Sequence, residues 1–401
     1  MSGSRFARRA LSAAACLSSL VWALPGTARA VSLGGTREVG SWASAPPLRD
    51  PITIRLQQAN RTMIVPGNHV FRYLNSGAGP ATGQLARFGR YVWAARGITG
   101  IGADTWSIAT ATTNNALTLR IAGGPGYAYR FRVNGSLSPI KYLPTGTKAW
   151  RTYDVTVRFP DRGLHTVIFQ MDGIHSYFNG AVKPAQGHLV APKLNVGPRV
   201  IFLGDSWTAG AEVSAPFLGY VQDAAQDLGL GDAWASGIGG TGYTQGGIVH
   251  LTWGMRLQSD VLRWHPATVI FAGSANDLTA PSATLRNAVT SVFTRTRRAL
   301  PHARLIAVGP WLFSGLIPPG YLASNQIISA AIRQVGGAFI DNQGWITGTG
   351  STQDPSHDGG NASTYIGTAN HPNVAGYRYI GARLAAAIRA LPPGAGLPVG
   401  G

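Results

Sequence analysis

The 401-residue sequence has only one cysteine, Cys16, and it lies in a stretch expected to be removed from the mature protein. The mature chain would then have no disulfide, no thiol nucleophile and no cysteine metal site. Cys16 does not fit a lipoprotein signal either, because Ala13 takes the place of the usual leucine. After residue 30, no apolar run approaches the roughly 20 residues that a transmembrane helix needs, so we expect no transmembrane segment.

The first 30 residues have the organisation of a cleavable secretory signal. Arg5, Arg8 and Arg9 form a basic start, residues 10–24 are mostly apolar, and Ala28-Arg29-Ala30 is a small-residue cleavage site. The Arg8-Arg9 pair also permits a twin-arginine export signal. Both interpretations predict a secreted or periplasmic protein.

Acidic residues are scarce: 16 Asp and Glu stand against 34 Lys and Arg, which gives a net charge of +18. Residues 31–197 carry 18 basic and 6 acidic residues (+12), whereas residues 198–401 carry 12 and 10 (+2). The basic half could attract an anionic polymer or a cell surface. However, 30 of the 34 basic residues are Arg, which fits a solvated basic face, and we favour that interpretation. No nucleic-acid-binding motif is present, and export argues against such a partner.

Residues 31–185 predict an all-β accessory domain. Residues 116–121 and 127–133 alternate in polarity, and turns rich in glycine, proline and asparagine separate them from similar runs at 153–159 and 165–169. Short strands at this spacing are typical of a β-sandwich or jelly roll. Residues 186–197, which contain Pro192 and Gly197, predict a linker.

Residues 198–395 predict an α/β domain in which a parallel sheet carries helices on both faces. Apolar runs and helical periodicity alternate along this part of the chain. We expect strands at 200–203, 233–235, 268–271, 305–308 and 338–340, and helices near 217–229, 253–263, 282–299, 322–335 and 373–391.

Ser206 follows the first of these expected strands. The apolar run from Val200 ends in Gly204-Asp205-Ser206, and Gly210 then precedes a helical stretch. The glycines allow a tight strand-to-helix turn, and open α/β sheets place their sites at the carboxyl ends of strands. A serine there is a candidate nucleophile if a base lies nearby.

Three later segments supply the other groups that acyl transfer needs. Gly240 lies in a glycine-rich loop, Asn276 follows the 268–271 strand, and His371 precedes the last expected helix. An imidazole can take the proton of a serine hydroxyl, while N–H donors stabilise the oxyanion. We expect those donors to be the backbone amides of Ser206 and Gly240 and the side chain of Asn276.

In this order, Ser206, Gly240, Asn276 and His371 resemble the four blocks of the SGNH (GDSL-type) hydrolase superfamily. The resemblance extends from about Pro198 to about Leu391. It implies a serine hydrolase acting on carboxylic esters, with Ser206 as nucleophile and His371 as base.

The sequence departs from that family in two blocks. Ser274-Ala275-Asn276-Asp277 stands where the family often has Gly-x-Asn-Asp. Thr368 stands where the family usually has an aspartate, three residues before the histidine. A backbone carbonyl could orient His371 instead, or Asp354 or Asp358 could supply the acid, or the site could be weakened.

Three functions follow from this resemblance. The first is a secreted esterase, favoured here, that removes small acyl groups such as O-acetyl from a polysaccharide. The all-β half loosely resembles the domain that precedes the hydrolase in carbohydrate esterase family two, and this suggests an acylated carbohydrate as substrate. The second is an O-acyltransferase that passes the acyl group to a sugar. The third is a non-catalytic carbohydrate-binding protein of the cell envelope.

The remaining polar and aromatic candidates favour structural roles. We expect Asp205 and Asp277 to stabilise turns and His165 to be a hydrogen-bonded strand residue. The tryptophans of the α/β half mostly fit packing. The run Asp354-Pro-Ser-His-Asp358 could suggest a metal, but no other ligand spacing supports one, so we predict no metal and no cofactor.

Overall fold

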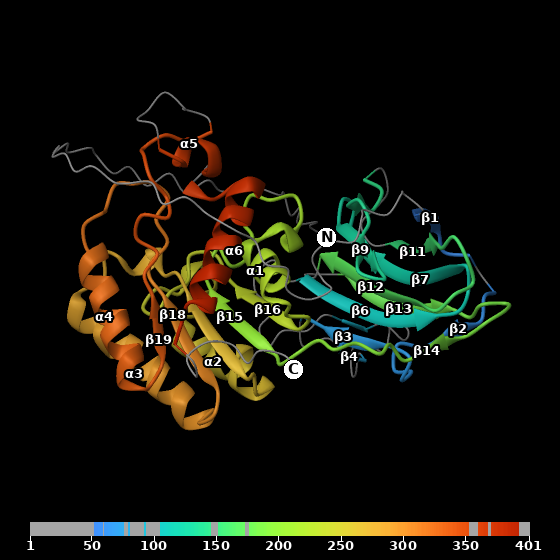
Figure 1. Cartoon of the computed structure of the whole chain (residues 1–401), viewed down its shortest axis with the longest axis horizontal. Helices are drawn as coiled ribbons and strands as arrows, with labels where there is room; N and C mark the ends of the chain where they lie inside the picture. The colour runs from blue at the N-terminus through green and yellow to red at the C-terminus, as the bar shows by residue number, and fades with distance from the viewer. Residues whose placement is uncertain are drawn as a thin grey trace, which may run out of the picture. The chain divides into compact units, whose positions relative to one another are not determined.

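The computed structural model describes residues 52–392 except 59, 76–78, 81–91, 94–104, 146–150, 173–175, 353–359 and 368–369 (Figure 1). The predicted secretory signal lies outside these residues and stays a prediction. Within the described part of the chain, no helix is both long enough and apolar enough to cross a membrane.

The first half of the described chain forms two antiparallel β-sheets, as the alternating sequence predicts. One sheet has the order β1-β11-β7-β13-β5-β4, with β2 beside β13. The other has the order β10-β8-β12-β6-β14, with β3 beside β6 and β9 beside β8. The strands are β1 (Ile52–Leu56), β2 (Met63–Ile64), β3 (Arg72–Leu74), β4 (Gly79–Pro80), β5 (Val92–Trp93), β6 (Thr105–Thr112), β7 (Ala116–Gly123), β8 (Ala128–Val133), β9 (Ser136–Leu137), β10 (Lys141–Tyr142), β11 (Arg151–Arg158), β12 (His165–Asp172), β13 (Tyr177–Val182) and β14 (Leu189–Val190).

Apolar side chains of both sheets share one core. Tyr129 and Phe131 of β8, with Phe169 of β12, lie in it and are almost fully buried. Their rings are 4.9–6.5 Å apart between centroids. The alternation along β8 therefore places its aromatic side chains in the core.

The second half forms a five-stranded parallel sheet in the order β16-β15-β17-β18-β19. From β15 the chain moves to one side for β16 and then crosses back to the other side for β17. The neighbourhood of β15 is thus the topological switch point, where open α/β sheets bind their ligands. The strands are β15 (Val200–Gly204), β16 (Ala233–Gly237), β17 (Thr268–Ala272), β18 (Arg304–Val308) and β19 (Ala338–Ile340).

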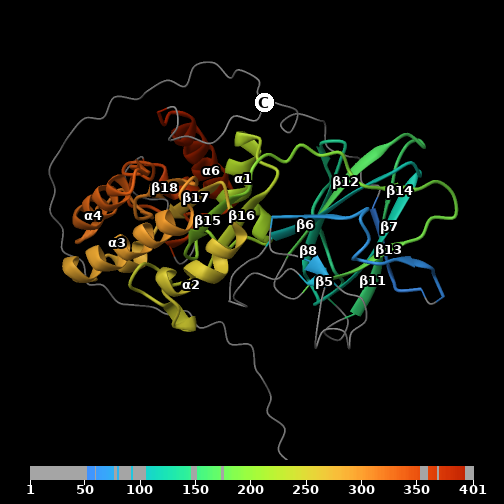
Figure 2. The same ribbon diagram turned by 90° about the horizontal axis from the view of Figure 1, so that it is seen from below.

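Helices cover both faces of this sheet (Figures 1 and 2). The alternation of β15 explains this, because Val200 and Phe202 pack in the cluster that contains α1 and α6, whereas Ile201 and Leu203 pack in the cluster of α2, α3 and α4. The α-helices are α1 (Tyr220–Leu228), α2 (Trp253–Asp260), α3 (Ser282–Ala299), α4 (Tyr321–Gln334), α5 (Ala362–Tyr365) and α6 (Val374–Arg389), and the short 3₁₀ helices are η2 (Pro216–Leu218), η3 (Gly247–Val249), η4 (Leu262–Trp264) and η5 (Ala275–Asp277).

The predicted elements of the α/β half agree with the observed ones to within a few residues, and the predicted fold class is confirmed. The domain boundaries at 185, 197 and 395 stay a prediction, because the structure does not test them.

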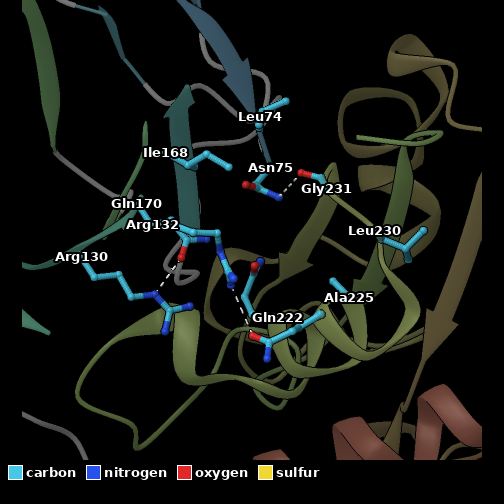
Figure 3. A pocket seen from close by; sticks show the side chains of 11 residues that line it. Leu74, Asn75, Arg130, Arg132, Ile168, Gln170, Gln222, Ala225, Leu230 and Gly231 are labelled. Carbon is cyan, nitrogen blue, oxygen red and sulfur yellow. Dashed lines mark hydrogen bonds between the residues drawn. The ribbon is translucent and has the colours of Figure 1, made fainter. Parts of the chain in front are cut away.

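A polar cavity of about 40 Å³ is lined by residues of β3, β8, β12 and α1 (Figure 3). Arg130 and Arg132 project into it from β8, and the Arg130 Nε donates to Gln170 Oε1 at 2.7 Å. Burial, with a smaller contribution from Arg132, lowers the pKa of Arg130 to about 10. The cavity contains neither Ser206 nor His371, so it is separate from the site described next.

Candidate active site

Ser206 lies in a tight turn directly after β15, half-buried, at the carboxyl end of the parallel sheet. Glycines make this turn possible. A Cβ on Gly204 would lie 1.9 Å from Thr208 Oγ1, and a Cβ on Gly237 of β16 would lie 2.1 Å from the Ala209 backbone nitrogen. The turn can therefore pack against the ends of its own strand and of β16 only because both positions lack a side chain.

His371 lies in the loop that leads into α6. Its carbonyl accepts a hydrogen bond from the Gly367 N–H at 2.7 Å, which closes a small loop. Asn373 caps α6 by accepting from the Gly376 N–H at 2.8 Å. The loop and the cap together hold the imidazole at the start of α6. The Tyr377 hydroxyl, one turn into the helix, donates to the Ala211 carbonyl at 3.0 Å and joins α6 to the segment after Ser206.

The two predicted partners are in contact. His371 Nε2 lies 2.8 Å from Ser206 Oγ, although the residues are 165 positions apart in the sequence. When the imidazole proton is on Nδ1, Nε2 accepts from the serine hydroxyl. This is the geometry that a general base needs to remove the proton of a nucleophile.

The glycine-rich loop and Asn276 meet beside this pair. A Cβ on Gly239 would lie 3.8 Å from the Ser206 Cβ, so the backbone that leads to Gly240 passes next to the serine. Asn276 Nδ2 donates to the Thr241 carbonyl at 2.9 Å. A primary amide carries two N–H bonds, so the second remains to serve as a donor at the site.

Asp277 organises the loop that contains Gly240. Its carboxylate accepts from the backbone N–H groups of Tyr243, Thr244 and Gln245 at 2.7–3.1 Å. It also accepts from the hydroxyl of Ser274. A buried carboxylate with this many donors is a structural anchor, which agrees with the predicted turn role.

Asp205 has the same kind of role one strand away. It accepts from the Trp207 N–H at 3.0 Å and from the Ser274 N–H at 3.2 Å. Burial raises its pKa to about 6, against the effect of these two N–H donors. Asp205 thereby joins the serine turn to the segment that carries Asn276.

Ser274 stands where the family often has glycine, and its backbone conformation explains that preference. Its φ is 91°, a left-handed value that favours glycine. The bonds that Ser274 makes to Asp205 and Asp277 hold it there, so the departure from the family pattern leaves this turn intact.

Arg256 of α2 was not singled out by the sequence, yet it lies beneath the candidate site. Its side chain is fully buried and forms an ion pair with Asp260 at 3.0 Å. Arg256 and Asp260 are four residues apart, a spacing that resembles ordinary pairs on exposed helices. The amphipathic pattern of α2 alone could not indicate that Arg256 is buried, because several partners of its guanidinium are distant in the sequence.

Four residues considered in the sequence analysis lie outside the described residues: Asp354, His357, Asp358 and Thr368. His165, by contrast, lies in the described part. His165 is buried, stacks on Phe159 with ring centroids 4.4 Å apart, and contacts Asn134 Nδ2 at 3.1 Å. It is therefore a packed and hydrogen-bonded strand residue, as expected.

The aromatic side chains near the site pack in the interior, also as expected. Trp207 stacks on Trp311 with centroids 5.3 Å apart and planes at 9°. Both are at least 95% buried, as is Tyr243. They support the serine turn and the neighbouring loops from inside and do not line an open cleft.

Residues 202–379 match the GDSL-like Lipase/Acylhydrolase family. This range begins in β15 and includes Ser206, Gly240, Asn276 and His371. No curated protein matches the chain in sequence.

Several solved structures resemble this chain along most of its length. A family two carbohydrate esterase from Cellvibrio japonicus has a TM-score of 0.59 and 15% identity, and the match covers 84% of this chain and 98% of that one. The corresponding enzyme from Clostridium thermocellum, in complex with cellohexaose, has a TM-score of 0.57 and 17% identity, and the match covers 72% of this chain and 93% of that one. The salicylyl-acyltransferase SsfX3 from a tetracycline biosynthetic pathway has a TM-score of 0.58 and 13% identity, and the match covers 82% of this chain and 99% of that one.

The fold and the family match define the class of the α/β half. Residues 202–379 form a GDSL-type, or SGNH, hydrolase domain, so the predicted superfamily is confirmed. The match supports an enzyme that acts on ester bonds.

Proposed function

We propose that this protein is an exported serine esterase that removes small acyl groups, O-acetyl above all, from a polysaccharide. The observation that carries the proposal is the 2.8 Å contact between Ser206 Oγ and His371 Nε2 inside an SGNH domain. The likeness to family two carbohydrate esterases extends into the all-β half and supports a carbohydrate ester as substrate.

The proposed chemistry starts from the contact between Ser206 and His371. His371 Nε2 takes the proton of Ser206 Oγ, and the oxygen attacks the acyl carbonyl. The negative charge then faces the N–H groups of Ser206, Gly240 and Asn276. His371 returns the proton to the leaving sugar oxygen, and an acyl-serine remains. Water then releases the acid by the same steps in reverse, and Ser206 is regenerated.

A substrate panel tests this function. We expect hydrolysis of p-nitrophenyl acetate at a higher kcat/KM than the butyrate and octanoate esters, and release of acetate from acetylated xylan, measured by NMR. Release from the nitrophenyl esters but not from acetylated xylan would refute the carbohydrate substrate and leave the esterase. No hydrolysis of any ester by the folded protein would refute the esterase.

Acyl transfer is the second candidate, because the salicylyl-acyltransferase SsfX3 matches nearly its whole length to this chain. Water and a sugar hydroxyl compete for the same acyl-serine. Adding a sugar acceptor such as cellobiose to the p-nitrophenyl acetate assay distinguishes the two. An acetylated sugar as the main product, detected by mass spectrometry, would identify a transferase, whereas free acetate would identify a hydrolase.

Replacing Asn276 by alanine is expected to lower kcat by roughly 10²–10³-fold, as removal of one oxyanion donor does. KM should change little, because the donor acts on charge that develops only in the transition state. Steady-state kinetics with p-nitrophenyl acetate measure both constants. Asn287→Ala, on the exposed side of α3, is the matched control. A rise in KM alone would indicate substrate binding in place of oxyanion stabilisation.

A further inference from the structure

Arg256 is a buried cation that donates hydrogen bonds to backbone carbonyls of the site as well as to side chains. Burial lowers its pKa, while Asp260 raises it again, and the ion pair between them measures 3.0 Å. A buried ion pair by itself seldom stabilises a fold more than apolar side chains of the same size would. The position of this arginine therefore needs an explanation beyond stability.

The guanidinium reaches three segments at once. Nη1 donates to the Gly204 carbonyl at 3.2 Å, two residues before Ser206. Nη1 also donates to Thr241 Oγ1 at 2.9 Å, next to Gly240. Nη2 donates to the Ser236 carbonyl at 2.7 Å, near the end of β16. The guanidinium thus joins the turn of Ser206 to the loop that contains Gly240, whose backbone N–H is an expected oxyanion donor.

Thr241 extends this connection to the third block of the site. Its side chain accepts from Arg256 and from Trp253 Nε1 at 3.2 Å, and it donates to the Ile238 carbonyl at 2.7 Å. Its backbone carbonyl accepts from Asn276 Nδ2 at 2.9 Å. Thr241 is fully buried, so water cannot take over these bonds.

We propose that Arg256 is a positioning residue that holds the Ser206 turn, the Gly240 loop and, through Thr241, the Asn276 side chain in the arrangement in which their N–H groups converge. This inference rests on the proposed function, because the converging groups are its oxyanion donors. The role requires the planar guanidinium, whose N–H groups point in fixed directions like the prongs of a fork. An ammonium group cannot reach two carbonyls and a hydroxyl in fixed directions.

The experiment separates positioning from stability by removing the whole ion pair. Arg256→Met alone leaves Asp260 buried without its cation, so Tm should fall by roughly 5–10 °C. The double variant Arg256→Met/Asp260→Leu removes both charges, and we expect it to recover most of that Tm. Its kcat for p-nitrophenyl acetate should nevertheless stay on the order of 10²-fold below wild type with KM little changed, because small displacements of catalytic groups have effects of that size.

The chain offers a matched control in the other half. Arg120 and Asp154 form a second buried ion pair, with Nε and Oδ1 2.7 Å apart, on the paired strands β7 and β11. Arg120→Met/Asp154→Leu should change Tm to a similar degree and leave kcat as in wild type. Arg256→Lys keeps the charge but loses the fork, so we expect kcat to fall at least 10-fold.

Labelling of Ser206 by a fluorophosphonate gives a second readout, because it needs the same nucleophile and N–H donors without a natural substrate. Wild-type kcat and labelling rate in the Arg256→Met/Asp260→Leu or Arg256→Lys variants would overturn the positioning role alone. A wild-type protein that neither hydrolyses esters nor reacts with the probe would overturn the proposed function, and this inference with it.

Discussion

Replacing Ser206 by alanine is expected to lower kcat for ester hydrolysis on the order of 10⁶-fold, as loss of a catalytic serine does. The hydroxyl lies 2.8 Å from His371 Nε2, which is in position to remove its proton before it attacks an acyl carbonyl. The side chain is only half-buried, and its loss leaves no large cavity, so Tm should change little.

Ser282→Ala, at the exposed start of α3, is the matched control and should behave as wild type. The assay is steady-state hydrolysis of p-nitrophenyl acetate, together with labelling by a fluorophosphonate and mass spectrometry of the labelled peptide. Near wild-type turnover in Ser206→Ala, or a label on a different residue, would refute Ser206 as the nucleophile.

Replacing His371 by alanine is expected to be nearly as damaging, because a nucleophile and its base act as a unit. The double variant Ser206→Ala/His371→Ala should then be no less active than either single variant. His302→Ala, on an exposed turn before β18, is the control. A loss of less than about 10-fold in His371→Ala, in a folded protein, would show that another group removes the serine proton.

The group that orients His371 is a separate question, which three further variants address. A loss on the order of 10⁴-fold in Asp354→Asn or Asp358→Asn would identify a displaced acid, as for a neutralised triad aspartate. Mild effects at both would favour a serine–histidine pair oriented by the backbone. Thr368→Ala should be mild, because a hydroxyl cannot compensate the charge of an imidazolium. A severe loss there would contradict our interpretation of this loop.

The candidate site combines a reactive pair that a substrate can reach with buried polar side chains that hold the surrounding loops. Ser206 and His371 are half-buried, so a substrate can reach them. Asp205, Thr241, Arg256 and Asp277 beneath them are almost completely buried and bind mainly backbone groups of the loops above. Groups held in this way need little reorganisation during the reaction, which is the condition for strong oxyanion stabilisation.

The sequence by itself determined the architecture of the α/β half. The runs that became β15 and β17 are short and apolar throughout, and the helices between them are periodic, so a parallel sheet with two covered faces was the expected result. The order of Ser206, Gly240, Asn276 and His371 also indicated the hydrolase class, because it resembles the four blocks of the SGNH superfamily.

Only the tertiary structure decided which groups meet. The contact between Ser206 and His371 depends on the crossover order of the sheet and on the loop before α6, which local patterns do not encode. The role of Arg256 is the clearest case. In the sequence it is one half of an i, i+4 pair of the kind common on exposed helices. Arg256 becomes buried only when α2 packs under the ends of β15 and β16. The same packing brings its guanidinium within hydrogen-bonding distance of the carbonyls of Gly204 and Ser236, which are distant in the sequence.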